Sequence, residues 1–371
     1  MFIYLILNYR GYKEVPKPSH LPDSPPPLSV IIACKKNASS IGNCLDSLGR
    51  QDYPNMEIIV LNENPTNDPN DETTQIVKNR AKEYSNIFLH QFPASPKGWS
   101  GKTYLQHQGA LMARGDWLLF LDPRTVLQPN CISRSISYCL DHQIDFFSLM
   151  PGYHLRTFWE KLILPIVFGW FGTRFSLQKV NDPKSKQAVA VGQYMQIRKK
   201  AYQATGGFQN VKNEILEDSA LARTVKGMGL KYRLLGGKHL LTSRVYGGLR
   251  EIWQMWERVF VGEVGSSPLA ILYTFTIIGI TTILPFVSVL WCAFVLGLDA
   301  VNPWILLLIV GQCVLVLTAR LLLDMVLGIG PLFAFLQPIG ASFALAILVS
   351  SLYHTILGSL EKVKGRVASE I

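Results

Sequence analysis

The chain has 371 residues, of which 49% are hydrophobic and 17% are charged, and its formal net charge is +10. Its mean hydropathy of +0.20 exceeds that of one ordinary soluble domain, and the apolar residues concentrate after about residue 266. The basic residues are scattered rather than interleaved with aromatic residues on one sheet, which excludes a nucleic-acid-binding protein. Composition therefore predicts a soluble part followed by a membrane-embedded part.

Charge and cysteine usage both bear on the surroundings of the chain. The positive charge fits contact with anionic lipid head groups or with a phosphorylated substrate. It also fits the positive-inside bias of membrane proteins, which needs no ligand, and we assign most of the charge to that bias. The six cysteines show no CxxC or Cys/His spacing, so a structural zinc site is not expected. Free thiols fit a soluble part that faces a reducing cytosol.

The first predicted region covers residues 1–27. Residues 2–9 are apolar but far shorter than the roughly 20 residues that span a bilayer, and no signal-peptide cleavage pattern follows them. They are interpreted as the remnant of an anchor or as an interfacial foot. Residues 16–27 contain six prolines, which predict an extended linker.

Residues 28–243 form the second predicted region, because strands and helices alternate along its first part. Apolar runs predict four strands, at residues 28–34, 56–62, 86–92 and 116–122. Helical periodicity predicts three helices, at residues 38–50, 72–84 and 101–114. This alternation is typical of a parallel α/β sheet, which binds nucleotides at the carboxyl ends of its strands.

Three further segments of this region carry distinct patterns. Residues 158–177 are rich in Trp, Phe, Leu and Ile around Pro165, which predicts an amphipathic or membrane-dipping element. Residues 192–208 predict a strand, a short helix and a Gly-Gly turn. Residues 214–229 predict a helix that begins near the pair Glu217-Asp218. The helix macrodipole favours acidic residues at that end, so the pair admits a purely structural interpretation.

The last predicted regions are a helix and a membrane part. Residues 244–265 predict an interfacial amphipathic helix, and its large apolar residues share one face: Leu249, Ile252, Trp253, Trp256 and Phe260. Residues 266–371 contain about three apolar segments that are long enough to span a membrane, at 268–297, 303–323 and 331–357.

Charged residues in and after these segments raise two questions. Arg320 and Asp324 are four residues apart, and we favour a structural ion pair over a substrate contact. Three spans after a cytosolic domain place the C-terminus outside, yet the basic stretch 361–366 prefers the inside. A re-entrant segment, a contribution of the N-terminal stretch and an exception to the rule all stay open.

Five stretches resemble, in order and spacing, the family-2 glycosyltransferases, which have a GT-A fold. The nearest resemblance is to membrane-attached bacterial enzymes associated with carotenoid and hopanoid synthesis. It covers roughly residues 28–265 and is carried by LSVIIACKKNASSIGNCLDSLGRQDYPNMEIIVLNENPTND, GWSGKTYLQHQGALMARGDWLLFLD, VGQYMQIRKKAYQATGGF, EDSALARTVKGMG and RVYGGLREIWQMWERVF.

The resemblance implies inverting transfer of a sugar from a nucleotide-sugar donor. By position, Asp218 matches the catalytic base of the family, and Glu217 precedes it in the same motif. Lys102 matches the lysine near the donor diphosphate, where it would neutralise phosphate charge. Trp256 and Arg258 lie where related membrane enzymes carry a Trp/Arg motif, although the spelling differs from that of processive enzymes.

The chain also departs from the family pattern. Residues 33–37 do not read Pro-Ala-Arg-Asn-Glu, and Asn62-Glu63 replaces two aspartates, the second of which contacts the base of the donor. Asp122 is followed two residues later by Arg124, where the Asp-x-Asp motif has its metal ligand. A cationic side chain cannot bind Mg²⁺ or Mn²⁺. Either Arg124 replaces the metal and clamps phosphate oxygens, with Asp122 still contacting the donor, or donor binding is lost. No cofactor is therefore certain, and Mg²⁺ or Mn²⁺ stays an alternative.

Together these observations predict an α/β, Rossmann-like GT-A domain with C-terminal transmembrane helices. The expected function is glycosyl transfer at the cytosolic face of the cell membrane. The expected partners are a nucleotide-sugar donor, membrane lipids and a lipophilic acceptor hydroxyl or carboxyl, such as a carotenoid, hopanoid or other polyprenoid. The alternative is a catalytically silent relative that acts as a membrane binding or assembly protein. The altered Trp/Arg motif and the few spans disfavour a processive polysaccharide synthase.

Overall fold

The computed structural model describes residues 11–16, 21–64, 68, 71–244, 246–265, 267–296 and 301–356. The predictions for residues 2–9 and 361–366 lie outside these described residues. The chain divides into two compact units. We call them the α/β unit, within Gly11–His154 and Leu177–Val245, and the helical unit, within Leu155–Ser176 and Tyr246–Val363.

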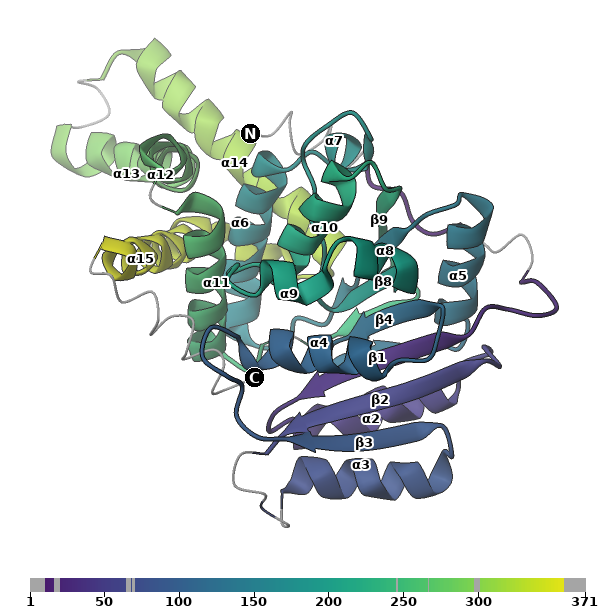
Figure 1. Cartoon of the computed structure of the whole chain (residues 1–371). Helices are drawn as coiled ribbons and strands as arrows, with labels where there is room; N and C mark the ends of the chain where they lie inside the picture. The colour runs from purple at the N-terminus through teal and green to yellow at the C-terminus, as the bar shows by residue number, and fades with distance from the viewer. Residues whose placement is uncertain are drawn as a thin grey trace. The chain divides into compact units, whose positions relative to one another are not determined.

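A seven-stranded sheet forms the centre of the α/β unit (Figure 1). Its strands, in spatial order, are β3 (Ile87–Phe92), β2 (Met56–Glu63), β1 (Leu28–Cys34), β4 (Trp117–Leu121), β8 (Tyr194–Arg198), β6 (Phe146–Met150) and β9 (Tyr232–Gly236). Strands β3, β2, β1 and β4 are mutually parallel, and β8 runs antiparallel to both of its neighbours. Strand β9 is parallel to β6, so the sheet is mixed and β8 alone runs against the other six strands. The four predicted strands are β1 to β4, and the strand predicted within residues 192–208 is β8.

Strand β1 is buried along its whole length, because helices cover both faces of the sheet. Val30 and Ile32 belong to the same apolar cluster as Ile41 of α2 (Ala38–Gly49). Ile31 faces the other way, against Gly109 of α4 (Gly101–Met112), where a β-carbon would clash with it. This close approach explains why a glycine lies inside α4 despite its low helix propensity.

The remaining elements of the α/β unit lie around this centre. A small sheet contains β5 (Thr125–Leu127), β10 (Leu241–Ser243) and β7 (Gly152–Tyr153). The other helices are α3 (Glu72–Glu83), α5 (Cys131–Asp141), α7 (Leu177–Asn181), α8 (Lys199–Ala204), α9 (Gly207–Val211) and α10 (Glu217–Gly227). The predicted turn after α8 is present, and Gly206 and Gly207 both have positive φ angles. The predicted helix over residues 214–229 is α10.

The helical unit contains two helices that are long and apolar enough to cross a membrane, Pro303–Leu327 and Pro331–Thr355. A third crossing would require Pro268–Ile280 and Leu284–Phe294 to act as one span, although they are bent by 43°. Pro285 lies in the first turn after this bend, where a proline is tolerated, and it has no N–H group to continue the hydrogen bonding of the preceding helix across the bend. Of the three predicted segments, the structure therefore gives two continuous helices and one broken pair.

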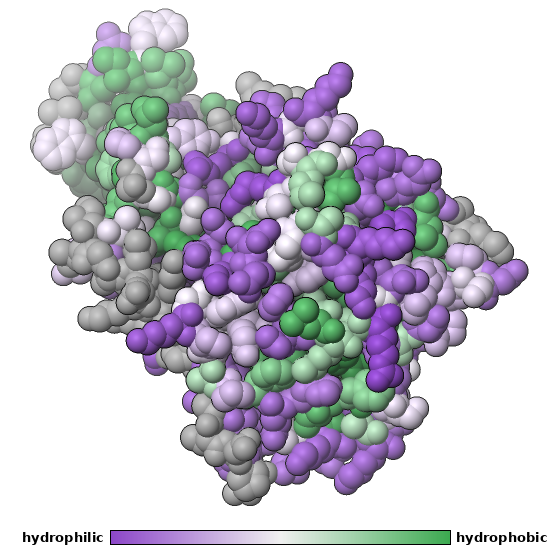
Figure 2. All heavy atoms as spheres, in the orientation of Figure 1, coloured by the Kyte–Doolittle hydropathy of each residue, from purple (hydrophilic) through white to green (hydrophobic). Residues whose placement is uncertain are grey.

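The helical elements are, in chain order, α6 (Phe158–Arg174), α11 (Leu249–Val264), α12 (Pro268–Phe275), η1 (Thr276–Ile280), α13 (Leu284–Trp291), η2 (Cys292–Leu296), α14 (Pro303–Leu327), η4 (Pro331–Leu336) and α15 (Gln337–Ile356). Large apolar side chains remain exposed on the later helices, including Phe294 at 83% and Leu269 at 79%. Figure 2 shows hydrophobic residues gathered over α12, α13 and α14. Such an exposed apolar surface is typical of contact with lipid.

A buried arginine joins α14 to α6. Arg320 pairs with Asp324 at 2.8 Å, as the sequence predicts, and both side chains are almost fully buried. Arg320 also donates to the carbonyl oxygens of Lys161, at 2.6 Å, and Leu162, at 3.2 Å. Pro165 has no N–H group to donate to the Lys161 carbonyl, so Arg320 satisfies an acceptor that the proline leaves open. The ion pair is therefore part of helix packing.

Candidate active site

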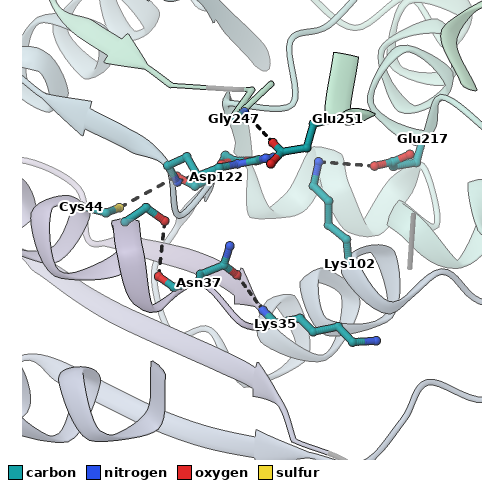
Figure 3. Close-up of polar contacts among 10 residues, drawn as sticks. Lys35, Asn37, Cys44, Lys102, Asp122, Glu217, Gly247 and Glu251 are labelled. Carbon is teal, nitrogen blue, oxygen red and sulfur yellow. Dashed lines mark hydrogen bonds and ion pairs between the residues drawn. The ribbon is translucent and has the colours of Figure 1, made fainter. Parts of the chain in front are cut away.

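Three polar side chains follow the parallel strands where these strands end. Lys35 follows β1, Glu63 ends β2 and Asp122 follows β4. Because parallel strands end at one edge of a sheet, these side chains share the edge where α/β proteins bind ligands. Lys35 Nζ lies 2.9 Å from Glu63 Oε1, and the Lys35 backbone N–H donates to Asn37 Oδ1 at 2.7 Å (Figure 3). Glu63, which is expected to contact the nucleobase of the donor, is thus already paired with a cation.

Asp122 and Arg124 form a two-point ion pair. Nε of Arg124 donates to Oδ1 of Asp122 at 3.2 Å, and Nη2 donates to Oδ2 at 3.3 Å. The backbone N–H of Arg124 adds a bond of 2.9 Å to Oδ1. Burial by itself raises the pKa of Asp122, but the charge and hydrogen bonds of Arg124, with a smaller contribution from Lys102, bring this pKa below its usual value. Asp122 is therefore a buried carboxylate held ionised by its neighbours.

Lys102 reaches the site from the first turn of α4. Ser100 caps this helix, because its Oγ accepts from the backbone N–H of Thr103 at 3.2 Å. The Lys102 side chain points toward Glu217, and its Nζ lies 3.4 Å from Glu217 Oε1 (Figure 3). Glu217 is only 3% exposed, so this contact places a cation beside a buried carboxylate.

Asp218 occupies the first turn of α10, directly after Glu217. Its Oδ2 accepts from the backbone N–H of Gly192 at 3.1 Å, and its Oδ1 accepts from the N–H of Ser219 at 2.7 Å. The Asp218 carboxylate interacts electrostatically with two buried phenols, Tyr153 and Tyr232. Burial is the main cause that raises the pKa of both phenols, and the charge of Asp218 adds to it. The Asp218 carboxylate is thus fixed in orientation by backbone donors.

Comparison with known proteins identifies the family of the chain. Residues 25–238, more than half of the chain, match the model of the family described as "Glycosyltransferase like family 2". The chain belongs to this family. Its α/β unit is a GT-A-like domain, as the sequence predicts.

Individual relatives are more distant. An uncharacterized glycosyltransferase, YibD of Escherichia coli (strain K12), is 27% identical over 119 residues, which are 32% of this chain and 32% of that relative's length. The mannosyltransferase PcManGT of Pyrobaculum calidifontis, solved with GDP-Man and Mn²⁺, is 15% identical, with a TM-score of 0.55 and coverage of 95% of this chain and 94% of that one. S. aureus TarS 1–349 with UDP-GlcNAc is 14% identical, with a TM-score of 0.43 and coverage of 87% and 91%.

The edge of the sheet around Asp122, which we call the donor edge after the proposal below, does not fit a divalent metal. Both oxygens of Asp122 are engaged by Arg124, whose guanidinium lies where a cation would bind them. No group of three or more His, Cys, Asp or Glu side chains converges to hold a metal among the residues described above. Oxygen-ligated Mg²⁺ or Mn²⁺ needs several such ligands. The side chains beside Asp122 are cationic, namely Arg124 and, at longer range, Lys102.

The predicted site residues therefore fall into separate groups. Lys102, Glu217 and Asp218 converge, and Asp122 pairs with Arg124. Trp256 and Arg258 belong to α11 of the helical unit, where Trp256 is 5% exposed and packs against Phe168, with ring centres 5.8 Å apart and ring planes tilted by 58°.

The apolar face of α11 is buried in the helical unit at Ile252, Trp256 and Phe260. An interfacial position for this helix stays a prediction.

Lys35 at the sheet edge and two residues near Asp218, Gly192 and Tyr153, carry no role in the sequence analysis. Gly192 lies in the stretch VGQY, which belongs to the family resemblance, but a glycine before a strand carries no chemical signal of its own. Tyr153 lies in the two-residue strand β7, which is too short to leave a periodic pattern. Both are brought to Asp218 by tertiary structure alone.

Proposed function

We propose that the protein is an inverting glycosyltransferase that uses a nucleotide-sugar donor and a lipophilic acceptor. The observation that supports this most is the convergence of a fixed carboxylate, Asp218, and a lysine ammonium, Lys102, within a family-2 domain. A base and a phosphate-neutralising cation are the two groups that such a transfer needs.

In this proposal, Asp218 accepts the proton of the acceptor hydroxyl. The acceptor oxygen then forms a bond to the anomeric carbon of the sugar, while the bond from that carbon to the phosphate oxygen breaks. The bonding electrons leave with the nucleoside diphosphate, and Lys102 and Arg124 stabilise its developing charge. The single displacement inverts the configuration at the anomeric carbon.

Arg124 and Lys102 support donor binding without a metal. A guanidinium offers several N–H donors in one plane, which match phosphate oxygens, and Asp122 keeps it in place. Asp122 also accepts hydrogen bonds from hydroxyls of the donor in this proposal, and Glu63 with Lys35 contacts the nucleobase of the donor. The alternative, a silent relative, draws on the same observation, because Asp122 is already occupied by Arg124.

The helical unit supports the proposal of a lipophilic acceptor. Two helices apolar enough to cross a membrane hold the enzyme at a bilayer, so an acceptor dissolved in that bilayer shares its compartment. Trp256 and Arg258 are proposed on the acceptor side. The domain faces the cytosol in this proposal, because nucleotide sugars are cytosolic, and its six cysteines are all free thiols. A cysteine-accessibility map that places residues 28–240 outside the cell would contradict this orientation.

The test uses the purified full-length protein in detergent or lipid nanodiscs. UDP- and GDP-sugars are titrated with Mn²⁺ and with EDTA, and transfer of labelled sugar to membrane-lipid extracts is followed in parallel. We expect donor binding and transfer that survive EDTA. Abolition by EDTA with rescue by Mn²⁺ would refute the metal-free site, and absence of donor binding under every condition would favour the silent relative.

A further inference from the structure

The backbone of the segment Ala190–Gln193 connects two groups of site residues, one around Asp218 and one around Asp122. The N–H of Gly192 donates to Asp218 Oδ2 at 3.1 Å. The carbonyl of the next residue, Gln193, accepts from the backbone N–H of Asp122 at 3.2 Å. Two adjacent residues, Gly192 and Gln193, therefore bind the Asp218 carboxylate and the backbone of Asp122.

Buried side chains fix this segment from below. The N–H of Val191 donates to Ser148 Oγ at 2.9 Å, and the N–H of Ala190 donates to Ser219 Oγ at 3.3 Å. Ser148 is fully buried in β6, and its hydroxyl also donates to the carbonyl of Tyr194 at 3.0 Å. The segment is thus tied to the sheet and to α10 by separate bonds.

The missing side chain of Gly192 leaves the space that the reacting groups occupy. A β-carbon at this position would lie 2.9 Å from Lys102 Nζ and 3.2 Å from Asp218 Oδ2, and both distances are shorter than ordinary van der Waals contact. Its φ angle is not in the left-handed region, so backbone conformation does not require a glycine here. A glycine is required here because the Lys102 ammonium and the Asp218 carboxylate need the space that a side chain would fill.

We propose that Ala190–Gln193 is the positioning element of the transfer reaction and that Gly192 is its decisive positioning residue. Gly192 orients the base through its N–H and, by having no side chain, lets the Lys102 ammonium approach Asp218. This inference rests on the proposed function. It adds that the spacing of the catalytic base and the phosphate-binding cation is set by one glycine between them.

Substitution of Gly192 by alanine tests the proposal. The nearest obstacle to the new methyl group is the tip of a flexible lysine, which can move, so we expect the variant to fold. The displaced ammonium and the reoriented carboxylate should lower kcat by about 10²-fold, because misplacement of reacting groups by about 1 Å costs this much. Donor KM should change far less than kcat.

Gly227→Ala is the matched control, because Gly227 ends the same helix as Asp218 and a β-carbon there meets nothing within 4 Å. We expect full activity from it. Ser148→Ala is the second variant, which loosens the segment without adding an atom, and it should lower kcat with donor KM retained. Equal loss of kcat in Gly227→Ala, or near-normal kcat in Gly192→Ala, overturns the proposal; near-normal kcat in Ser148→Ala alone refutes the role of the segment around Gly192.

A double-mutant cycle separates spacing from general damage. Lys102→Ala lowers activity by itself but removes the atom nearest to the new methyl group. The further loss caused by Gly192→Ala should therefore be at least about threefold smaller in the Lys102→Ala background than in the wild type. Strictly additive losses contradict the role of Gly192 in spacing these two groups. A wild-type protein that neither binds donor nor transfers sugar instead refutes the proposed function itself.

Discussion

The two units use buried charge in opposite ways. In the α/β unit, the cations at the sheet edge keep contact with solvent: the Lys102 side chain is 18% exposed and that of Arg124 is 26% exposed. In the helical unit, Arg320 and Asp324 expose 2% and 1%. In the proposed function, Lys102 and Arg124 receive a phosphate and need an open side, whereas Arg320 binds helix carbonyls and does not. On that proposal, exposure separates charges placed for a ligand from a charge placed for packing.

The largest expected effect comes from the base. Asp218→Asn keeps the size of the side chain and one acceptor oxygen, so it loses one of the two backbone hydrogen bonds from Gly192 and Ser219, and it cannot take a proton at neutral pH. We expect turnover to fall by about 10²–10⁴-fold with donor binding retained, measured by transfer assays and by calorimetric titration of donor. Near-wild-type turnover would remove Asp218 from the mechanism and leave it a helix-capping residue.

Disruption of the buried Arg320–Asp324 pair should lower the stability of the protein rather than change its chemistry. Arg320→Met leaves Asp324 as an uncompensated buried charge and the Lys161 carbonyl without its donor. Breaking a buried pair in this way costs about 3–5 kcal/mol, which thermal unfolding in detergent would detect. The double variant Arg320→Met/Asp324→Leu should recover part of this loss. Unchanged stability of the single variant would show that the pair does not hold α14 to α6.

Arg124→Asp tests the role of the partly exposed arginine in the α/β unit. The change restores two carboxylates at the donor edge and removes the guanidinium. We expect activity to fall without metal and to rise on addition of Mn²⁺, whereas wild-type activity should not change with Mn²⁺. A variant that ignores Mn²⁺ would show that the donor edge lacks further ligands even when the arginine is gone.

The smallest expected effect is on the pH dependence of stability. Arg124 keeps the pKa of Asp122 below its usual value of about 3.9, so the pair stabilises the fold above that pH and loses this contribution as the pH falls below it. The difference in unfolding temperature between wild type and Arg124→Met should therefore be largest near pH 7 and shrink toward pH 3. A difference that is constant across this range would contradict the assignment.

Local patterns were sufficient for much of the fold. The apolar runs at residues 28–34 and 56–62 correspond to β1 and β2, because a strand buried on both faces must be apolar throughout. The spacing of Arg320 and Asp324 predicted their pair, because residues four apart share a helix face. The assignment of Phe158–Arg174 to the helical unit was not predictable, since its apolar residues suit lipid and protein neighbours equally.

The contacts of the site were beyond such patterns. Lys35 and Glu63 are 28 residues apart and meet only because β1 and β2 are adjacent in parallel register. Gly192 lies 26 residues from Asp218 and acts through a backbone N–H, which every residue except proline has. Family resemblance pointed to Asp218 and Lys102, but the pairing of Arg124 with both oxygens of Asp122 required coordinates.

The junction of α6 with α14 limits how this protein can be shortened. A chain cut near residue 245 would contain every predicted donor and base residue, and it would also contain α6. That helix would then lack Arg320 at its proline-opened carbonyl and Gly340, whose place against the Leu162 carbonyl leaves no room for a β-carbon. Its apolar face would have no partner, so the truncated enzyme should aggregate. A soluble fragment requires removal of residues 155–176 as well.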